Sequence, residues 1–263
     1  MKLRYLGIIL LSAAVLFVAR AATAAAEEAV TSFAQSAVLS PAGSLSVSDE
    51  IYYDFGLPAT HDISFTLPLT YHDDQGREFR MAFHLLSALQ DGNSILLAPD
   101  VTLATARITL PAPKIGSVSH YTLRFTLAPV VLRGLTADIL KLSVTGLSWS
   151  VPINQATIHL ETPTEPADNV TCFTGAQGST TGRCTVEQQA KVTTVTSYAP
   201  LQPGETLSIL SDFPYKSFTT YLESYEKQRT NPVALITLAI FALGLFIAAI
   251  VGFNLIRRRP RNG

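Results

Sequence analysis

Two cysteines, Cys172 and Cys184, are the residues whose chemistry the sequence constrains most, because the chain of 263 residues contains no others. In an exported protein, an even number of cysteines indicates a disulfide. A reactive thiol pair would need a CxxC spacing or an adjacent histidine, and this pair has neither. We therefore predict a structural disulfide, and closing a flexible loop of this length stabilises a fold by about 3 kcal/mol.

The segment between the cysteines is rich in glycine and threonine, and it is the best candidate for an interaction site. Its glycines resemble a phosphate-binding loop in composition only, since no lysine and no following helix accompany them. A surface loop that is held by a disulfide is a common place for a binding site. The residues of this possible site are Phe173, Thr174, Gly175, Gln177, Gly178 and Ser179.

Patterns for catalysis and metal binding are otherwise missing from the sequence. The histidines show no metal-ligand spacing such as HExxH, and no GxSxG segment marks a serine nucleophile. A triad can still assemble from distant residues, so an envelope hydrolase of unknown substrate stays open as an alternative. We predict no catalytic residue, no metal and no cofactor. The five histidines are His61, His72, His84, His120 and His159.

Trp149 is the only tryptophan, and it could stack on a sugar or a peptide. It lies between Leu147 and Val151 in an alternating run, however, with Pro152 next in the chain. Such a position is typical of a strand whose large aromatic side chain anchors the core. We expect Trp149 to be buried.

Alternation of apolar and polar residues predicts β-strands throughout the middle of the chain. Residues 63–71 and 79–85 alternate on either side of turn residues and predict a β-hairpin, with Pro68 marking an edge strand or a bulge. Further runs follow at 106–110, 121–127, 139–144, 156–160, 192–198 and 207–210. We predict a mainly β fold: an antiparallel β-sandwich over residues 27–217, followed by one C-terminal transmembrane α-helix.

The N-terminus has the pattern of a secretory signal peptide over residues 1–26. Lys2 and Arg4 precede an apolar run at 6–18, and small residues up to Ala26 suit signal peptidase. The alternative is an uncleaved anchor, but the apolar run is short for a span of about 20 residues.

Residues 233–256 contain no charge and predict a transmembrane helix of about 36 Å, which exceeds the hydrocarbon core of about 30 Å. A basic tail, 257–263, follows with Arg257, Arg258, Arg259 and Arg261. The positive-inside rule then places the tail in the cytoplasm and the N-terminal domain outside the plasma membrane. Residues 218–232 form a juxtamembrane segment that could begin as a short helix.

Gly244, Ala248 and Gly252 recur every four residues in the predicted helix. Such a stripe of small residues lets two helices pack closely, so a homodimer through the membrane is a hypothesis. The alternative is ordinary composition, because glycine and alanine are common in membrane helices.

Charge is distributed unevenly along the chain. All 20 acidic residues lie between Glu27 and Glu226, and residues 27–229 contain only 12 basic residues, so this part has a formal charge of 12 − 20 = −8. An acidic domain does not suit nucleic acid, whose phosphates demand basic patches, nor does it favour lying flat on anionic lipid.

Four segments resemble the N-terminal domain of the bacterial DUF2207 membrane proteins. They are an opening strand at 43–55, a Gly-x-x-Trp-x-x-Pro-Ile segment at 145–153, a Cys-x-Thr-Gly-x-x-Gly-Ser loop at 172–179 with Cys184, and a proline-glycine turn at 201–205. The resemblance covers about residues 35–215 and implies an exported β domain of unknown function without catalytic residues. Members of that family usually continue into further transmembrane helices, whereas this chain stops after one.

These observations predict a non-enzymatic binding or accessory module of the cell envelope, with an envelope protein or a surface polymer as its partner. A sensing ectodomain that acts through a membrane partner is the alternative. The hydrolase stays as the third reading.

Overall fold

The computed structural model describes residues 27–56, 61–72, 78–113, 116–166, 170–219 and 224–225. The predicted signal peptide, transmembrane helix and basic tail therefore lie outside the described residues. Contacts divide the chain into a first unit, Met1–Tyr71 with Phe79–Glu223, and a second unit, His72–Glu78 with Ser224–Gly263. Nearly all described residues belong to the first unit, whose fold is given below.

The described residues contain eighteen strands and no helix, which confirms the prediction of a mainly β fold. The strands are β1 Ala29–Leu39, β2 Leu45–Asp54, β3 Ile63–Pro68, β4 Thr70–His72, β5 Glu78–Arg80, β6 Ala82–Gln90, β7 Asn93–Ser94, β8 Asp100–Val101, β9 Thr105–Leu110, β10 Val118–Ala128, β11 Val131–Arg133, β12 Ala137–Ser143, β13 Ala156–Glu161, β14 Thr171–Gly175, β15 Cys184–Gln189, β16 Val192–Ser197, β17 Thr206–Pro214 and β18 Ser224–Tyr225.

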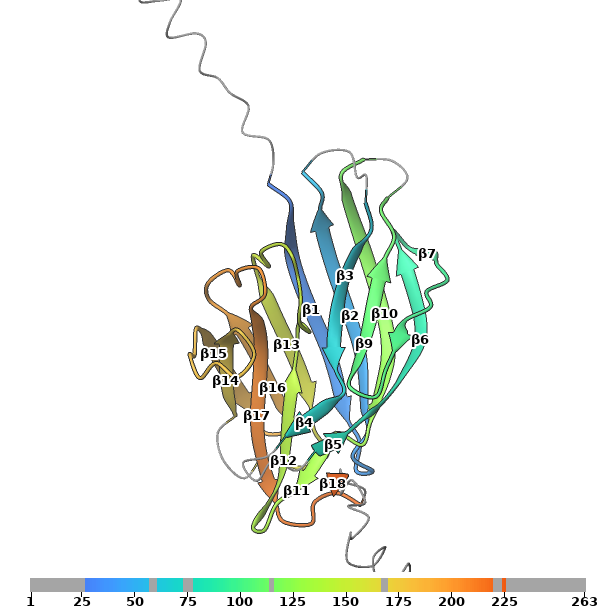
Figure 1. Cartoon of the computed structure of the whole chain (residues 1–263). Helices are drawn as coiled ribbons and strands as arrows, with labels where there is room; N and C mark the ends of the chain where they lie inside the picture. Colours follow the sequence, from blue (N-terminus) through green and yellow to red (C-terminus); the bar gives the residue numbers. More distant parts are fainter. Residues whose placement is uncertain are drawn as a thin grey trace, which may run out of the picture. The chain divides into compact units, whose positions relative to one another are not determined.

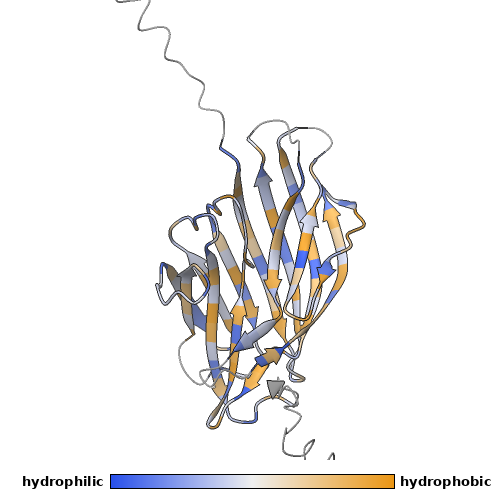
Figure 2. Cartoon of the chain, in the orientation of Figure 1, coloured by the Kyte–Doolittle hydropathy of each residue, from blue (hydrophilic) through white to orange (hydrophobic). Residues whose placement is uncertain are grey.

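The largest sheet has eight strands in the order β15-β16-β13-β1-β2-β10-β6-β7. A four-stranded sheet, β11-β12-β17-β14, and a three-stranded sheet, β3-β9-β8, form a second layer over it (Figure 1). Hydrophobic and hydrophilic residues alternate along the strands (Figure 2), and the residues of one face are buried between the layers. In β2, for example, Leu45, Val47, Ile51 and Tyr53 are all buried.

The prediction of purely antiparallel pairing is wrong at one place. β1 runs antiparallel to β2 but parallel to β13, with Phe33 opposite Ala156. The reason is the connection after β12, which carries the chain from the second layer into the large sheet and brings β13 in along the direction of β1. A parallel pair needs such a crossover, because a tight hairpin can join only antiparallel strands.

The predicted hairpin of residues 63–71 and 79–85 is also corrected. β3 pairs with β9, whereas β6 pairs with β10 in the other layer, so the two long strands separate. Near the turn, β4 and β5 remain neighbours, and Met81 N donates to Leu69 O over 2.8 Å. Pro68 ends the edge strand β3, as its missing N–H requires.

Trp149 is in the core, as predicted, with 2% of its surface exposed. Its ring stacks on Phe65 at 4.8 Å between centroids and meets Phe33 edge-on at 6.4 Å. Its Nε1 donates to Thr145 O over 2.7 Å, which satisfies the indole N–H inside the core. Trp149 thus joins β1 of the large sheet to β3 of the second layer.

A polar pair lies inside this apolar core. Gln35 Nε2 donates to Asp49 Oδ1 over 2.8 Å and to Val144 O over 3.1 Å. Gln35 Oε1 and Asp49 Oδ2 find no hydrogen-bond partner among the described residues. Burial raises the pKa of the Asp49 carboxyl to about 7, although the hydrogen bond from Gln35 offsets part of the rise. A protonated Asp49 would supply the donor that Gln35 Oε1 lacks.

Candidate functional site

The predicted disulfide between Cys172 and Cys184 is present. Cys172 lies on β14, at the edge of the four-stranded sheet, and Cys184 begins β15, at the edge of the eight-stranded sheet. The bond therefore ties the two layers together along one side of the first unit. The loop that it closes projects beyond these two strands.

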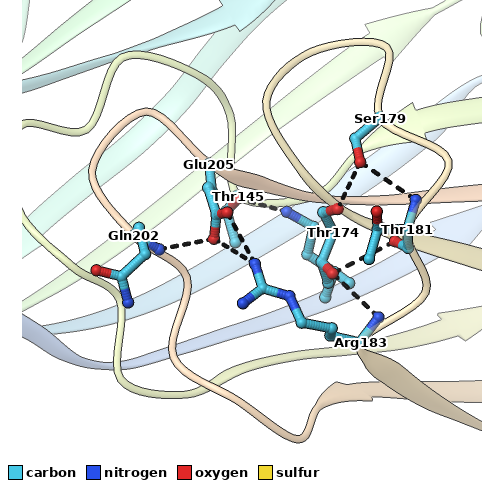
Figure 3. A network of polar contacts seen from close by, with 8 residues as sticks. Thr145, Thr174, Ser179, Thr181, Arg183, Gln202 and Glu205 are labelled. Carbon is cyan, nitrogen blue, oxygen red and sulfur yellow. Dashed lines mark hydrogen bonds and ion pairs between the residues drawn. The ribbon is translucent and has the colours of Figure 1, made fainter.

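Side-chain hydroxyls hold the loop in shape (Figure 3). Ser179 Oγ donates to Thr174 O over 2.9 Å and accepts from Thr181 N at 3.2 Å. Thr174 N donates to Thr181 O over 2.6 Å, and Thr174 Oγ1 accepts from Arg183 N at 3.1 Å. The hydroxyls of Thr174 and Ser179 thus stabilise the conformation of the loop.

Glycine is required at the bend of the loop. Gly175 has φ of +126°, and a Cβ on it would lie 2.7 Å from Ser179 Oγ. Both the backbone conformation and the close approach exclude a larger residue. Gly178 also has a positive φ, +86°.

An ion pair joins the loop to the turn before β17. Arg183 Nη2 donates to Glu205 Oε1 over 2.8 Å and to Oε2 over 2.6 Å (Figure 3). The same carboxylate accepts from Gln202 N at 2.8 Å. The side chains of Arg183 and Glu205 are 34% and 22% exposed, so water screens this pair only in part.

The turn that carries Glu205 also connects to the core. Thr206 Oγ1 lies 3.1 Å from Thr145 Oγ1, and Leu207 N donates to the same Thr145 oxygen over 3.1 Å. Because Thr145 O accepts from Trp149, hydrogen bonds tie Thr206 and Leu207, the two residues that follow Glu205 in the chain, to the core. The core thereby fixes the position of Glu205.

These elements enclose an open pocket of about 520 Å³. Its lining is mainly polar, and the exposed side chain of Gln177 adds an amide that can both donate and accept hydrogen bonds. The lining residues are Thr174, Gly175, Ala176, Gln177, Gly178, Ser179, Thr181, Arg183 and Glu205. Such a pocket suits a polar ligand that reaches it from solvent.

The structure brings together five of the six predicted loop residues in this pocket. Phe173 differs, because it lies half-buried on β14 opposite Ser208 and is not part of the lining. Sequence reasoning missed Thr181, Arg183 and Glu205. The available signal was the opposite charge of Arg183, which directly precedes Cys184, and Glu205, which ends the proline-glycine turn at 201–205.

The remaining predicted residues fall elsewhere. Gly244, Ala248 and Gly252, like the arginines at 257, 258, 259 and 261, lie outside the described residues. Within the part of the chain that the structure describes, no helix is long and apolar enough to span a membrane.

The histidines do not meet at one place. His120 stacks on Tyr52 and contacts Glu50, His61 lies 3.1 Å from Glu28, and His159 lies 3.0 Å from Thr194. Among the described residues, no three His, Cys, Asp or Glu side chains are placed to hold a metal ion.

Residues 29–213 match the family described as the N-terminal domain of the predicted membrane proteins of DUF2207. This match spans more than half of the chain, so the chain belongs to that family, as its cysteine loop predicted. Membership in a family of predicted membrane proteins supports a membrane location. No curated protein matches the sequence.

Solved structures share only a distant likeness with this chain. Yeast leukotriene A4 hydrolase in complex with bestatin has a TM-score of 0.48 at 10% identity, over 71% of this chain and 29% of that protein. The M1 zinc metallopeptidase from Deinococcus radiodurans has a TM-score of 0.36 at 13% identity, over 69% of this chain and 42% of that protein. This chain thus spans less than half the length of either enzyme. Likeness at this level says nothing about activity.

Proposed function

We propose that this chain is a membrane-anchored, extracytoplasmic β-sandwich domain that acts as a non-enzymatic binding module of the cell envelope. Membership in a family of predicted membrane proteins supports the anchored location. The disulfide supports an oxidising compartment, since such bonds are rare in the cytosol. The pairing of two β layers supports the sandwich.

The observation that carries the proposal is the preorganised pocket at the Cys172–Cys184 loop. A disulfide, a set of hydroxyl hydrogen bonds and the Arg183–Glu205 ion pair fix its shape before any ligand arrives. Preorganisation favours binding because the loop loses little conformational freedom when it is occupied. The pocket is open and polar, and it therefore suits a surface polymer or the polar surface of an envelope protein.

The contacts of Ser179 favour binding over hydrolysis. A serine nucleophile needs a base that accepts its proton. The hydroxyl of Ser179 instead donates to the Thr174 carbonyl. The carboxylate of Glu205 is engaged by Arg183 and by Gln202 N, so it is poorly placed to act as a base.

Site-specific photo-crosslinking in native membranes tests this function. A photoreactive amino acid replaces Gln177 in the pocket of the full-length protein, and the control carries the same group at Gln188, an exposed glutamine on β15. We expect a discrete crosslinked species from position 177 that is absent from position 188. Identical crosslinking patterns from the two positions would contradict the proposed binding site.

The anchored location has its own test. We expect full-length protein to stay with the membrane after extraction with alkaline carbonate, because a single span of this length is inserted in lipid. A reporter fused after Gly263 should be active in the cytoplasm. Release by carbonate would overturn the proposed anchoring, whatever the crosslinking result.

A further inference from the structure

Two turns meet at one end of the first unit. The β11–β12 turn and the turn that follows β17 lie side by side at the end opposite the start of β1 (Figure 1). Arg133 Nη2 donates to Phe218 O over 2.6 Å, and Phe218 N donates to Asp138 Oδ2 over 3.2 Å. These hydrogen bonds fix the point where the chain leaves the domain against the β11–β12 hairpin.

The side chains that project from these two turns have the composition of a membrane interface. Leu135, in the β11–β12 turn, is 98% exposed, and Tyr215 is 48% exposed. The Arg133 guanidinium lies 5.7 Å from the centre of the Tyr215 ring, and Lys216 Nζ lies 5.2 Å from it. A lone exposed leucine would need no explanation. Here it accompanies a tyrosine flanked by two cations, the pattern that marks interfacial belts.

The backbone holds this arrangement in place. Lys216 has φ of +64°, an uncommon conformation for a residue with a side chain. Ser217 N donates to Pro214 O over 3.1 Å and Ser217 Oγ donates to the same oxygen over 2.6 Å, which closes a tight turn. The turn therefore presents Tyr215 and Lys216 to solvent as a rigid pair.

We propose that this end of the first unit rests on the bilayer, with Leu135 entering the headgroup region and Lys216 facing lipid phosphates. The inference rests on the anchoring in the proposed function. Only 13 residues separate Thr219 from Val233, where the predicted span begins, so they reach at most about 45 Å when fully extended. Tethering at that distance keeps the turns at a high effective concentration near the lipid.

Charge complementarity selects lipid as the occupant. Asp138 is buried against Arg133 and does not face outward, whereas Lys216 is exposed beside the aromatic ring. Asp212, half-buried on β17 opposite Ile139, is the nearest carboxylate along that strand and limits the attraction. The acidic remainder of the domain disfavours lying on its side. Contact is therefore confined to the two turns.

Depth-dependent fluorescence quenching tests the contact on the full-length protein in vesicles of phosphatidylcholine with phosphatidylglycerol. The bimane probe is attached at Leu135→Cys, and the control is Asn93→Cys, an exposed position at the start of β7, which lies at the other end of the unit (Figure 1). Lipids with a nitroxide near the headgroup should quench position 135 at least about twofold more than position 93, because an interfacial side chain lies within their reach. Equal quenching would overturn the inference and leave a protein partner for this surface.

Two further experiments separate the phosphate contact from the membrane anchor. Lys216→Glu should lower quenching at position 135 in the anionic vesicles, whereas Lys141→Glu, an exposed lysine in the middle of β12, should not. Equal effects of the two substitutions would overturn the phosphate contact. Carbonate extraction of the same vesicles reports the anchor: retention together with equal quenching refutes only the inference, and release refutes the proposed function.

Discussion

The two layers of the first unit are joined at two places by opposite kinds of interaction. In the core, Trp149 joins them through buried ring contacts with Phe33 and Phe65. At the edge, the Cys172–Cys184 bond joins them through a covalent link, with polar contacts around it. The comparison teaches that buried ring packing and a covalent bond stabilise the same two layers, but that only the second region also carries the residues of the candidate pocket.

The largest effect should come from the core. Trp149→Ala removes a buried ring and leaves a cavity between β1 and β3, so it should lower the free energy of unfolding by about 3–5 kcal/mol. Denaturant unfolding of the full-length protein in detergent measures the loss. Trp149→Phe, which keeps an aromatic ring, should cost clearly less, and equal costs would argue that burial of the ring is not what joins the layers.

The buried pair of Gln35 and Asp49 predicts a pH dependence that originates in the core. Because burial raises the pKa of Asp49 from 3.8 to about 7, the folded state holds a proton that the unfolded state releases. The contribution of Asp49 to the free energy of unfolding is therefore fully present below about pH 4. It declines as pH rises to about 7, by up to about 4 kcal/mol at 1.4 kcal/mol per pKa unit.

The matched variant is Asp49→Asn, whose amide can donate to Gln35 Oε1 at every pH. It should remove this decline and stabilise the protein at pH 8. Unfolding curves at pH 4.5 and pH 8 would show it. If the wild-type protein lost no more stability between pH 4.5 and pH 8 than Asp49→Asn, the raised pKa of Asp49 would be refuted.

Loss of the disulfide should have a smaller and local effect. Cys172→Ser with Cys184→Ser should lower the free energy of unfolding by about 3 kcal/mol, because the loop regains freedom in the unfolded chain. Hydrogen exchange should rise most in residues 172–184, whereas the slowest amides of β1 and β2, which exchange through global unfolding, should accelerate only in line with that loss of stability. A larger acceleration in the large sheet than in the loop would mean that the edge and the core are not separable.

The smallest effect should come from the ion pair. Arg183→Ala and Glu205→Ala should each cost only about 0–1 kcal/mol of stability, since the pair is partly exposed. Each should nevertheless weaken crosslinking from position 177, because the pocket loses one wall. A double-mutant cycle gives the coupling energy, and unchanged crosslinking in both variants would separate the ion pair from binding.

Sequence alternation was sufficient for strands such as β10, where Tyr121, Leu123, Phe125 and Leu127 occupy every second position and are buried. It failed for β1, the central strand, because Gln35 occupies a core position and small alanines weaken the pattern. No local rule shows that a buried glutamine will meet Asp49 on the next strand. A polar residue at a core position weakens the apolar alternation from which a strand is predicted.

The candidate site divides in the same way. The disulfide and the loop residues could be predicted, since cysteine count and glycine content are local properties. The contact of Arg183 with Glu205 could not, because 22 residues separate them and only the pairing of β14 with β17 brings them together. A pocket residue that is contributed by a distant segment can be predicted only when the strand topology is known.

The parallel pairing of β1 with β13 has a consequence for how the chain reaches this fold. Phe33 pairs with Ala156, which follows it by 123 residues in the chain, so the middle of the largest sheet cannot close until most of the domain has been synthesised. Such long-range pairing slows folding and leaves strand edges open in the meantime. Until β13 has been synthesised, β1 keeps one unpaired edge, and such an edge is a site for aggregation.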